Sequence, residues 1–312
     1  EYMLWFFVGS NLLLNKDQAR ALLNWLVFLG TLVALHGVYQ YIIGVPIPEN
    51  WVDSAESVRT RVFSIVGSPN VLGSFLVLLI PVTVSQLLSA RGRARKYLYT
   101  LCLVPMVLSL IFTFSRGAWL AMVGALTVYG LMYNWRILLG LAAAAYTAPK
   151  LVPAIGARIG YMLSPAYLVS STRAGRVARW NMALNKVKNN PLTGEGFGRF
   201  GGAVADRHIP SSHYVDNFYL KTAAESGLIG IAVLAWLLLS GVRCALNTYR
   251  RLTDPYLKGL AGGMIAGLVG LLLHNVVENI FEVPMMTTYF WLLLGMTAAL
   301  PHLKGQETPP LD

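Results

Sequence analysis

The sequence predicts an all-α fold, a polytopic bundle of transmembrane helices with one long outward-facing loop, and three observations support this. Of the 312 residues, 55% are hydrophobic and only 12% are charged, whereas soluble domains average about 25% charged residues. The mean hydropathy is +0.55. Apolar stretches of about 20 residues, the length that crosses the hydrocarbon core of a bilayer, recur along almost the whole sequence. These features exclude an ordinary water-soluble fold and predict that residues 1–312 form a single membrane domain.

Nine apolar segments are predicted to be membrane spans. The first begins almost at Glu1, with no basic region or small-residue cleavage site before it, so it does not resemble a signal peptide. We interpret it as a shortened span and expect further N-terminal helices to be missing from the sequence. Proline lies within several of the segments, as membrane helices tolerate. The expected spans are 2–14, 21–44, 70–90, 97–114, 117–133, 137–155, 226–248, 259–280 and 285–303.

Basic residues in the short loops fall at alternate ends of these spans. Because cytoplasmic loops are enriched in Lys and Arg, the loops around residues 91–96 and 249–258 are predicted to be cytoplasmic. The long hydrophilic segment 156–225 then faces outward. From Lys150 to Lys221 the chain carries ten basic and three acidic residues. This segment is either a solvated basic loop or an anion-binding surface, and we favour the second interpretation.

Arginines on the predicted outer side are candidates for binding a phosphate group. Arg116 has apolar sequence on both sides, where a guanidinium is costly unless it faces a partner or a polar cavity. It either extends to the outer interface or grips phosphate oxygens with its planar fork, and we favour phosphate. Arg59 and Arg61, in the hydrophilic stretch 45–69, are predicted to contact the same substrate.

An amphipathic helix is predicted at residues 171–188. Arg173, Arg176 and Arg179 are spaced three apart and would share one helical face, with Trp180 on an apolar stripe opposite. The helix either adheres to the membrane surface or offers its basic face to a headgroup or pyrophosphate. The glycine-rich segment 194–202 that follows has no strand–helix context for a dinucleotide, so we expect a flexible substrate-facing loop and no cofactor.

A base is expected where the loop returns to the membrane. His213, Asp216 and Asn217 place an imidazole, a carboxylate and an amide together, which suits a general base acting on a sugar hydroxyl. Asp216 would equally serve as a helix N-cap. A weaker polar cluster comprises His274, Glu278 and Glu282. The outer acids form no compact pair of the kind that holds Mg²⁺ or Mn²⁺, so no metal site is predicted.

Several segments occur together in a particular order. They are Phe63–Gly73, Ser115–Ala118, Arg176 followed by Trp180, Asn190–Gly198, and Asp216-Asn217 with nine residues before Gly227-x-x-Gly230. In this order, over about residues 60–300, the chain resembles the O-antigen ligase/polymerase superfamily of bacterial membrane proteins.

The resemblance implies a C-type glycosyltransferase that works without metal or nucleotide sugar on the outer face of the bacterial cytoplasmic membrane. The implied donor is an undecaprenyl-diphosphate-linked glycan, the acceptor is a saccharide or lipid-linked saccharide, and transfer inverts the anomeric carbon. Arg116 and Arg176 match the family's arginines for the donor diphosphate. Ligases typically carry His-Asn where this chain has Asp216-Asn217, which favours a polymerase. We expect the lipid bilayer, but no nucleic acid, as a further partner.

The main alternative is a transporter for a small anion such as bicarbonate, because some members of the superfamily have been labelled so and a basic vestibule would suit an anion. A transporter of that kind commonly shows internal repeats with broken helices near mid-membrane. The two halves of this sequence show no self-similarity, and the polar residues gather at the predicted outer interface. The glycosyltransferase is therefore the favoured prediction.

Overall fold

The computed structural model describes residues 1–13, 15–48, 51, 60–173, 175–210 and 212–303, and across these residues the chain is built of helices, with no strand. The main helices are α1 (Leu4–Leu12), α2 (Lys16–Ile43), α3 (Pro69–Ser89), α4 (Arg93–Phe112), α5 (Arg116–Met132), α6 (Arg136–Leu151), α7 (Pro153–Met162), α8 (Pro165–Arg173), α9 (Arg176–Asn189), α10 (Ala203–His208), α11 (Phe218–Arg251), α12 (Pro255–His274) and α13 (Pro284–Ala299), with short 3-10 turns η2 (Ser64–Val66), η3 (Ile280–Glu282) and η4 (Leu300–His302).

Polar side chains begin several of these helices. The side chain of Asn15 accepts a hydrogen bond from the backbone N–H of Gln18 at the start of α2, and Asp254 does the same for Leu257 at the start of α12. Such side chains satisfy backbone donors that have no partner within the helix. Proline occupies the first turn of α3, α7, α12 and α13, where its missing N–H costs nothing.

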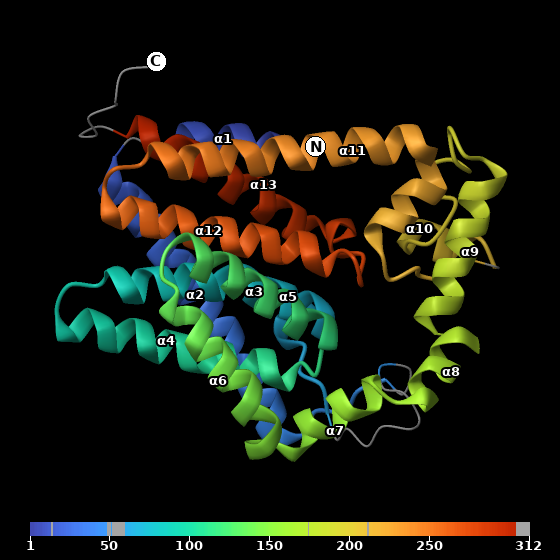
Figure 1. The fold of residues 1–312 in the computed structure, drawn as a ribbon, viewed down its shortest axis with the longest axis horizontal. Coiled ribbons are helices and arrows are strands. Elements are labelled where there is room, and N and C mark those ends of the chain that lie inside the picture. The colour runs from blue at the N-terminus through green and yellow to red at the C-terminus, as the bar shows by residue number, and fades with distance from the viewer. Residues whose placement is uncertain (14, 49–50, 52–59, 174, 211, 304–312) are drawn as a thin grey trace.

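Helices α3 and α12 form the centre of the bundle (Figure 1). In the apolar part of α3, 83% of the residues are buried, against 11% in α11. A Cβ on Gly267 of α12 would lie 2.5 Å from the carbonyl oxygen of Leu78 in α3. Small residues of this kind let membrane helices approach closely. The outer helices, α11 among them, therefore leave apolar side chains facing away from the protein, as a lipid environment requires.

The short basic loops gather at one end of the bundle. Lys16 at the start of α2 is ion-paired with Asp254 in the α11–α12 loop. The hydroxyl of Tyr256 donates to Gln86 near the end of α3, 2.9 Å away. In Figure 1 the α3–α4 and α11–α12 loops lie at the left, and α9 and α10 lie at the opposite end. The basic short loops therefore lie at one end of the bundle, and the long hydrophilic segment lies at the other.

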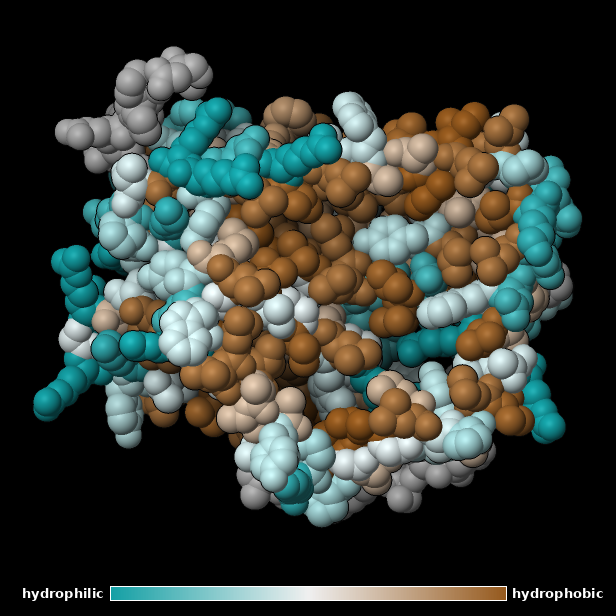
Figure 2. All heavy atoms as spheres, viewed as in Figure 1, coloured by the Kyte–Doolittle hydropathy of each residue, from teal (hydrophilic) through white to brown (hydrophobic). Residues whose placement is uncertain are grey.

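Hydrophobic side chains cover the middle of the molecule. Figure 2 shows them across the centre of the visible face, with hydrophilic side chains gathered mainly toward two opposite ends. Among the described residues, five helices are long and apolar enough to cross a membrane, namely α2, α3, α4, α11 and α12, and the bent pair α6–α7 would add a sixth. The chain is therefore an all-α, multi-pass membrane bundle. The other expected spans coincide with the shorter helices α1, α5 and α13, and their crossing stays a prediction.

Two expected helices differ from the structure. The span predicted at 137–155 stops near Val152, and the chain bends there by 97°. Pro153 accounts for this, because the residue before a proline is disfavoured in helical conformation and Val152 is extended. The amphipathic helix predicted at 171–188 is divided, since α8 ends at Arg173 and α9 begins after the extended Gly175. The sequence predicted that Arg173 and Arg176 share one helix, and this prediction is wrong, because Arg173 ends α8 and Arg176 begins α9.

Candidate active site

A large cavity lies between α8–α10 and the end of the bundle opposite the basic loops. Its volume is about 1130 Å³, which is at or slightly above the upper end of the usual range for small-molecule pockets, about 300–1,000 Å³. The walls come from α8, α9 and α10, from residues 213–216, from the start of α3, and from the segment between α12 and α13. Predicted site residues on the walls are Arg61, Arg173, Arg176, Arg179, His213 and Asp216.

Asp216 holds two of these arginines in place. Its Oδ2 lies 2.9 Å from Nη2 of Arg179 and 3.5 Å from Nε of Arg176. Arg179 also donates from Nη1 to the backbone oxygen of Tyr214, 3.0 Å away. Asp216 has a left-handed backbone with φ of +51°, which aspartate tolerates better than most residues. One carboxylate thus orients two guanidinium groups on the cavity wall, and their remaining N–H groups can meet an anion.

The position of α9 depends on a kink in α11 at Gly227, where the backbone is not helical. The chain turns after α9, and the backbone N–H of Leu228 donates to the oxygen of Pro191, 2.7 Å away. The N–H groups of Glu195 and Gly196 donate to the oxygens of Ala224 and Glu225. The glycine-rich segment, expected to be a flexible substrate-facing loop, is therefore bonded to α11 and serves to place α9. Around it a small second core is formed by Ala183, Phe200, Val215 and Ala224, with Trp180, Val187 and Leu220 packed against it.

Other predicted site residues lie away from the cavity. Arg116 stands at the start of α5 with its guanidinium 4.8 Å from the ring centre of Tyr167 in α8. Trp180 packs in the second core. The Asn217 side chain caps α11 by accepting from Leu220, and its N–H donates to Asn279. The structure does not bring these three onto the cavity wall, so their contact with substrate stays a prediction. Arg59 lies outside the described residues.

Arg61 lines the cavity but is largely engaged by the protein. Its Nε donates to the oxygen of Thr113 at 3.0 Å, its Nη1 to the oxygen of Trp51 at 2.6 Å, and its Nη2 to Oδ1 of Asn70 at 3.1 Å. Burial lowers the pKa of Arg61 to about 9, with nearby arginines contributing in the same direction. Arg61 therefore holds the segment before α3 against its neighbours and adds positive charge to the cavity wall.

Glu278 also lines the cavity. The side-chain amide of Asn70 donates to its Oε2, and the N–H of Asn279 donates to its Oε1 at 3.3 Å. Burial, and then the negative charge of Asp216, raise the pKa of Glu278 to about 7. The sequence offered only a weak signal here, the cluster of His274, Glu278 and Glu282. Within that cluster His274 lies buried, and its Nδ1 is 2.6 Å from Oγ of Ser74.

An ion-pair network ties α11 to η3 at the edge of the cavity. Nζ of Lys221 lies 2.5 Å from Oε2 of Glu225 and 3.1 Å from Oε1 of Glu282. Lys221→Met should lower the free energy of unfolding by about 3 kcal/mol, because the buried Glu225 and the half-buried Glu282 lose their cation. Thermal melting of the purified protein in detergent measures this, with the exposed Lys96→Met as the matched control. An unchanged melting temperature in Lys221→Met would contradict the network's role.

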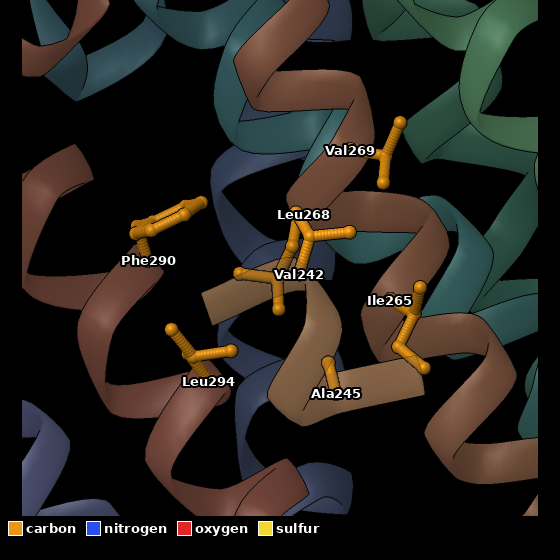
Figure 3. Close-up of a pocket in the computed structure, with 7 residues that line it drawn as sticks. All are labelled: Val242, Ala245, Ile265, Leu268, Val269, Phe290 and Leu294. Atoms are coloured by element: carbon orange, nitrogen blue, oxygen red, sulfur yellow. The ribbon is translucent and has the colours of Figure 1, made fainter. Parts of the chain in front are cut away.

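A second pocket does not compete with the cavity. It lies between α11, α12 and α13 and has a volume of about 10 Å³ (Figure 3), too little for any substrate. All of its lining side chains are apolar: Val242, Ala245, Ile265, Leu268, Val269, Phe290 and Leu294. It is a packing void.

Three of the cavity's arginines, Arg173, Arg176 and Arg179, fall within a segment that matches a known family. Residues 101–235 match the family model Wzy_C, described as O-antigen ligase. Over this segment, which is somewhat less than half of the chain, the protein is similar to the O-antigen ligase/polymerase superfamily. Among curated proteins, none matches the chain significantly. The match supports, in general terms, a membrane glycosyltransferase of the O-antigen ligase/polymerase type in a multi-pass bacterial membrane protein, and a family of this type implies lipid-linked glycan substrates.

The O-antigen ligase domain supplies only part of the cavity. Arg173, Arg176, Arg179 and Asp216 lie within the matched segment, whereas Arg61 and Glu278 come from outside it. Part of the site is thus contributed by segments on either side of the matched residues.

Proposed function

We propose that this protein transfers or polymerises an undecaprenyl-diphosphate-linked saccharide in the large cavity, on the outer face of the bacterial cytoplasmic membrane. One observation carries the proposal: Arg173, Arg176 and Arg179, which lie in α8 and α9, line one cavity together with Asp216. Arginine is suited to this task because its planar fork matches phosphate oxygens. The cavity is also large enough to admit a sugar beside the diphosphate.

In the proposed reaction, a hydroxyl of the acceptor sugar attacks the anomeric carbon of the donor. The bond from that carbon to the diphosphate oxygen breaks, and undecaprenyl diphosphate leaves with the electron pair. Charge develops on the diphosphate as the bond breaks, and preorganised guanidinium groups stabilise it without reorganising. Attack from the face opposite the leaving group inverts the anomeric centre.

Asp216 serves this reaction best as the anchor of the arginines. Its Oδ2 is engaged by Arg176 and Arg179, so taking a proton there would weaken both ion pairs. His213, the other predicted base, is exposed on the cavity wall. The aspartate stands where ligases typically carry histidine, which favours polymerisation over ligation. Arg116, which packs against Tyr167 outside the cavity lining, is proposed to reach the donor diphosphate when substrate binds.

The direct test is conversion of lipid-linked saccharides extracted from the source bacterium's own membranes. Purified protein in detergent or nanodiscs should release undecaprenyl diphosphate and give a longer or transferred glycan. If the protein instead moves a labelled small anion such as bicarbonate across proteoliposomes and leaves the extracted lipids unchanged, the transporter alternative replaces this proposal.

Transfer should persist when divalent cations are removed. Within the described residues no group of three or more His, Cys, Asp or Glu side chains could hold a metal ion, and the arginines supply the positive charge. The measurement is the initial rate of undecaprenyl diphosphate release with and without EDTA. A complete loss of activity that Mg²⁺ restores would contradict the arginine-based mechanism.

The cavity should face outward. After replacement of Cys102 and Cys244 by alanine, single cysteines at Lys188 in α9 and at Arg93 in α4 occupy exposed positions at opposite ends of the molecule. A membrane-impermeant thiol reagent applied to intact spheroplasts should label position 188 and spare position 93, because the basic short loops are cytoplasmic. The reverse pattern would invert the topology.

A further inference from the structure

Two segments distant in sequence, residues 61–70 and the segment around Glu278, meet on the cavity wall. Glu278 lies between α12 and η3, Asn70 lies in the first turn of α3, and Arg61 lies in the segment before α3. Arg61 donates from Nη2 to Oδ1 of Asn70, and Asn70 donates from Nδ2 to Oε2 of Glu278. All three residues line the cavity, and none belongs to the matched O-antigen ligase domain.

This chain of hydrogen bonds fixes the orientation of Asn70. A guanidinium can only donate, so it must meet the amide oxygen. The amide nitrogen is then turned toward Glu278. The backbone of Asn70 is held as well, because Oγ of Ser74 donates to its carbonyl oxygen at 3.1 Å. Asn70 is therefore a rigid donor, and Glu278 keeps one orientation toward the cavity.

Glu278 differs from Asp216 in the partners of its carboxylate. Two cations engage Asp216, whereas among the described residues the hydrogen bonds to the Glu278 side chain come from a neutral amide and a backbone N–H at 3.3 Å. An ionised carboxylate offers about four acceptor positions, so Glu278 can also accept from a substrate hydroxyl. It lies near enough to Arg176 for the two charges to interact, which places it beside the proposed diphosphate site.

We propose that Glu278 is the base that accepts the proton of the attacking hydroxyl and that Asn70 is the residue that positions it. The inference rests on the proposed function. The acceptor oxygen forms its bond to the anomeric carbon, its proton passes to a carboxylate oxygen of Glu278, and the diphosphate departs with the electrons of the broken bond. Asp216 keeps the arginines in place, so the two carboxylates have separate tasks.

The pH dependence of the reaction follows from the surroundings of Glu278. The charged and titratable groups that face it are Arg176 from α9, Arg61 from the segment before α3, and Tyr214 and Asp216 from the segment before α11. The base must be ionised to act, so activity rises as the pH rises through the pKa of Glu278, about 7. The bond from Asn70 stabilises the ionised form, and removing it should shift this rise to higher pH.

The experiment compares Glu278→Gln and Asn70→Ala with the control Asp17→Asn, which makes an acid-to-amide change at an exposed position of α2 that does not line the cavity. The substrate is the lipid extract described above, and binding of undecaprenyl diphosphate is measured separately by thermal shift. Glu278→Gln should lose on the order of 10²–10⁴ in kcat while binding undecaprenyl diphosphate normally. Asn70→Ala should lose less activity and move the acidic limb of its pH profile to higher pH, and Asp17→Asn should stay within a few-fold of wild type.

The outcomes are distinct. Wild-type protein that releases no undecaprenyl diphosphate overturns the proposed function and this inference with it. An active wild type with Glu278→Gln within tenfold of its kcat overturns the inference alone. If Glu278→Gln does not fold, Asn70→Ala decides the question, and an acidic limb that does not move overturns the inference.

Discussion

Arg176→Lys should lower turnover by about 10²–10³-fold, equivalent to about 3–4 kcal/mol of transition-state stabilisation. Arg176 reaches the cavity from the start of α9, and its Nε faces Asp216. Lysine keeps the charge but loses the fork that can face Asp216 on one side and a diphosphate on the other. The effect should fall mainly on kcat, because the charge on the diphosphate grows only as the bond breaks.

The matched control for this substitution is on the same helix. Lys188→Gln removes a charge from an exposed position of α9 that does not line the cavity. It alters only the surface field, which salt screens over about 10 Å at 0.1 M, so activity should change several-fold at most and mainly at low salt. Near-normal turnover in Arg176→Lys, with the melting temperature unchanged, would refute the diphosphate role of Arg176.

The membrane fold could be predicted from the sequence because hydropathy acts locally. Each apolar segment must satisfy its own backbone by forming a helix, so composition and segment length were enough to predict an all-α bundle. Helix breaks were less accessible. The bend at Val152 depends on Pro153, but proline is tolerated inside α3 and α4, so the residue alone does not reveal which helix will bend.

The candidate site was only partly predictable, because sequence patterns report local structure and the site is built largely from contacts between distant segments. The spacing of Arg176 and Arg179 placed both on one face of a helix, and the structure brings both to the cavity with Asp216. The meeting of Asn70 with Glu278, by contrast, depends on a contact across 208 residues of sequence. No local pattern encodes such a contact, because it arises from the packing of α3 against α12.

Gly227→Ala should be the most destabilising single substitution considered, costing about 4 kcal/mol or more, and should abolish transfer. Gly227 interrupts α11 with φ of +65° and ψ of −167°, a conformation that is essentially confined to glycine. A Cβ there would also lie 2.2 Å from the oxygen of Leu192, in the turn that leads away from α9. The substitution therefore strains the backbone and pushes this turn off α11.

Because that turn sets the position of α9, the arginines should leave the cavity even where the bundle survives. Gly140→Ala in α6 is the matched control, since a Cβ there meets nothing within 4 Å and alanine favours a helix. Thermal melting and size-exclusion chromatography in detergent, followed by the transfer assay, compare the two variants. Gly140→Ala should keep its melting temperature and activity. If Gly227→Ala does the same, the kink in α11 does not position α9, and the glycine must be explained by another contact.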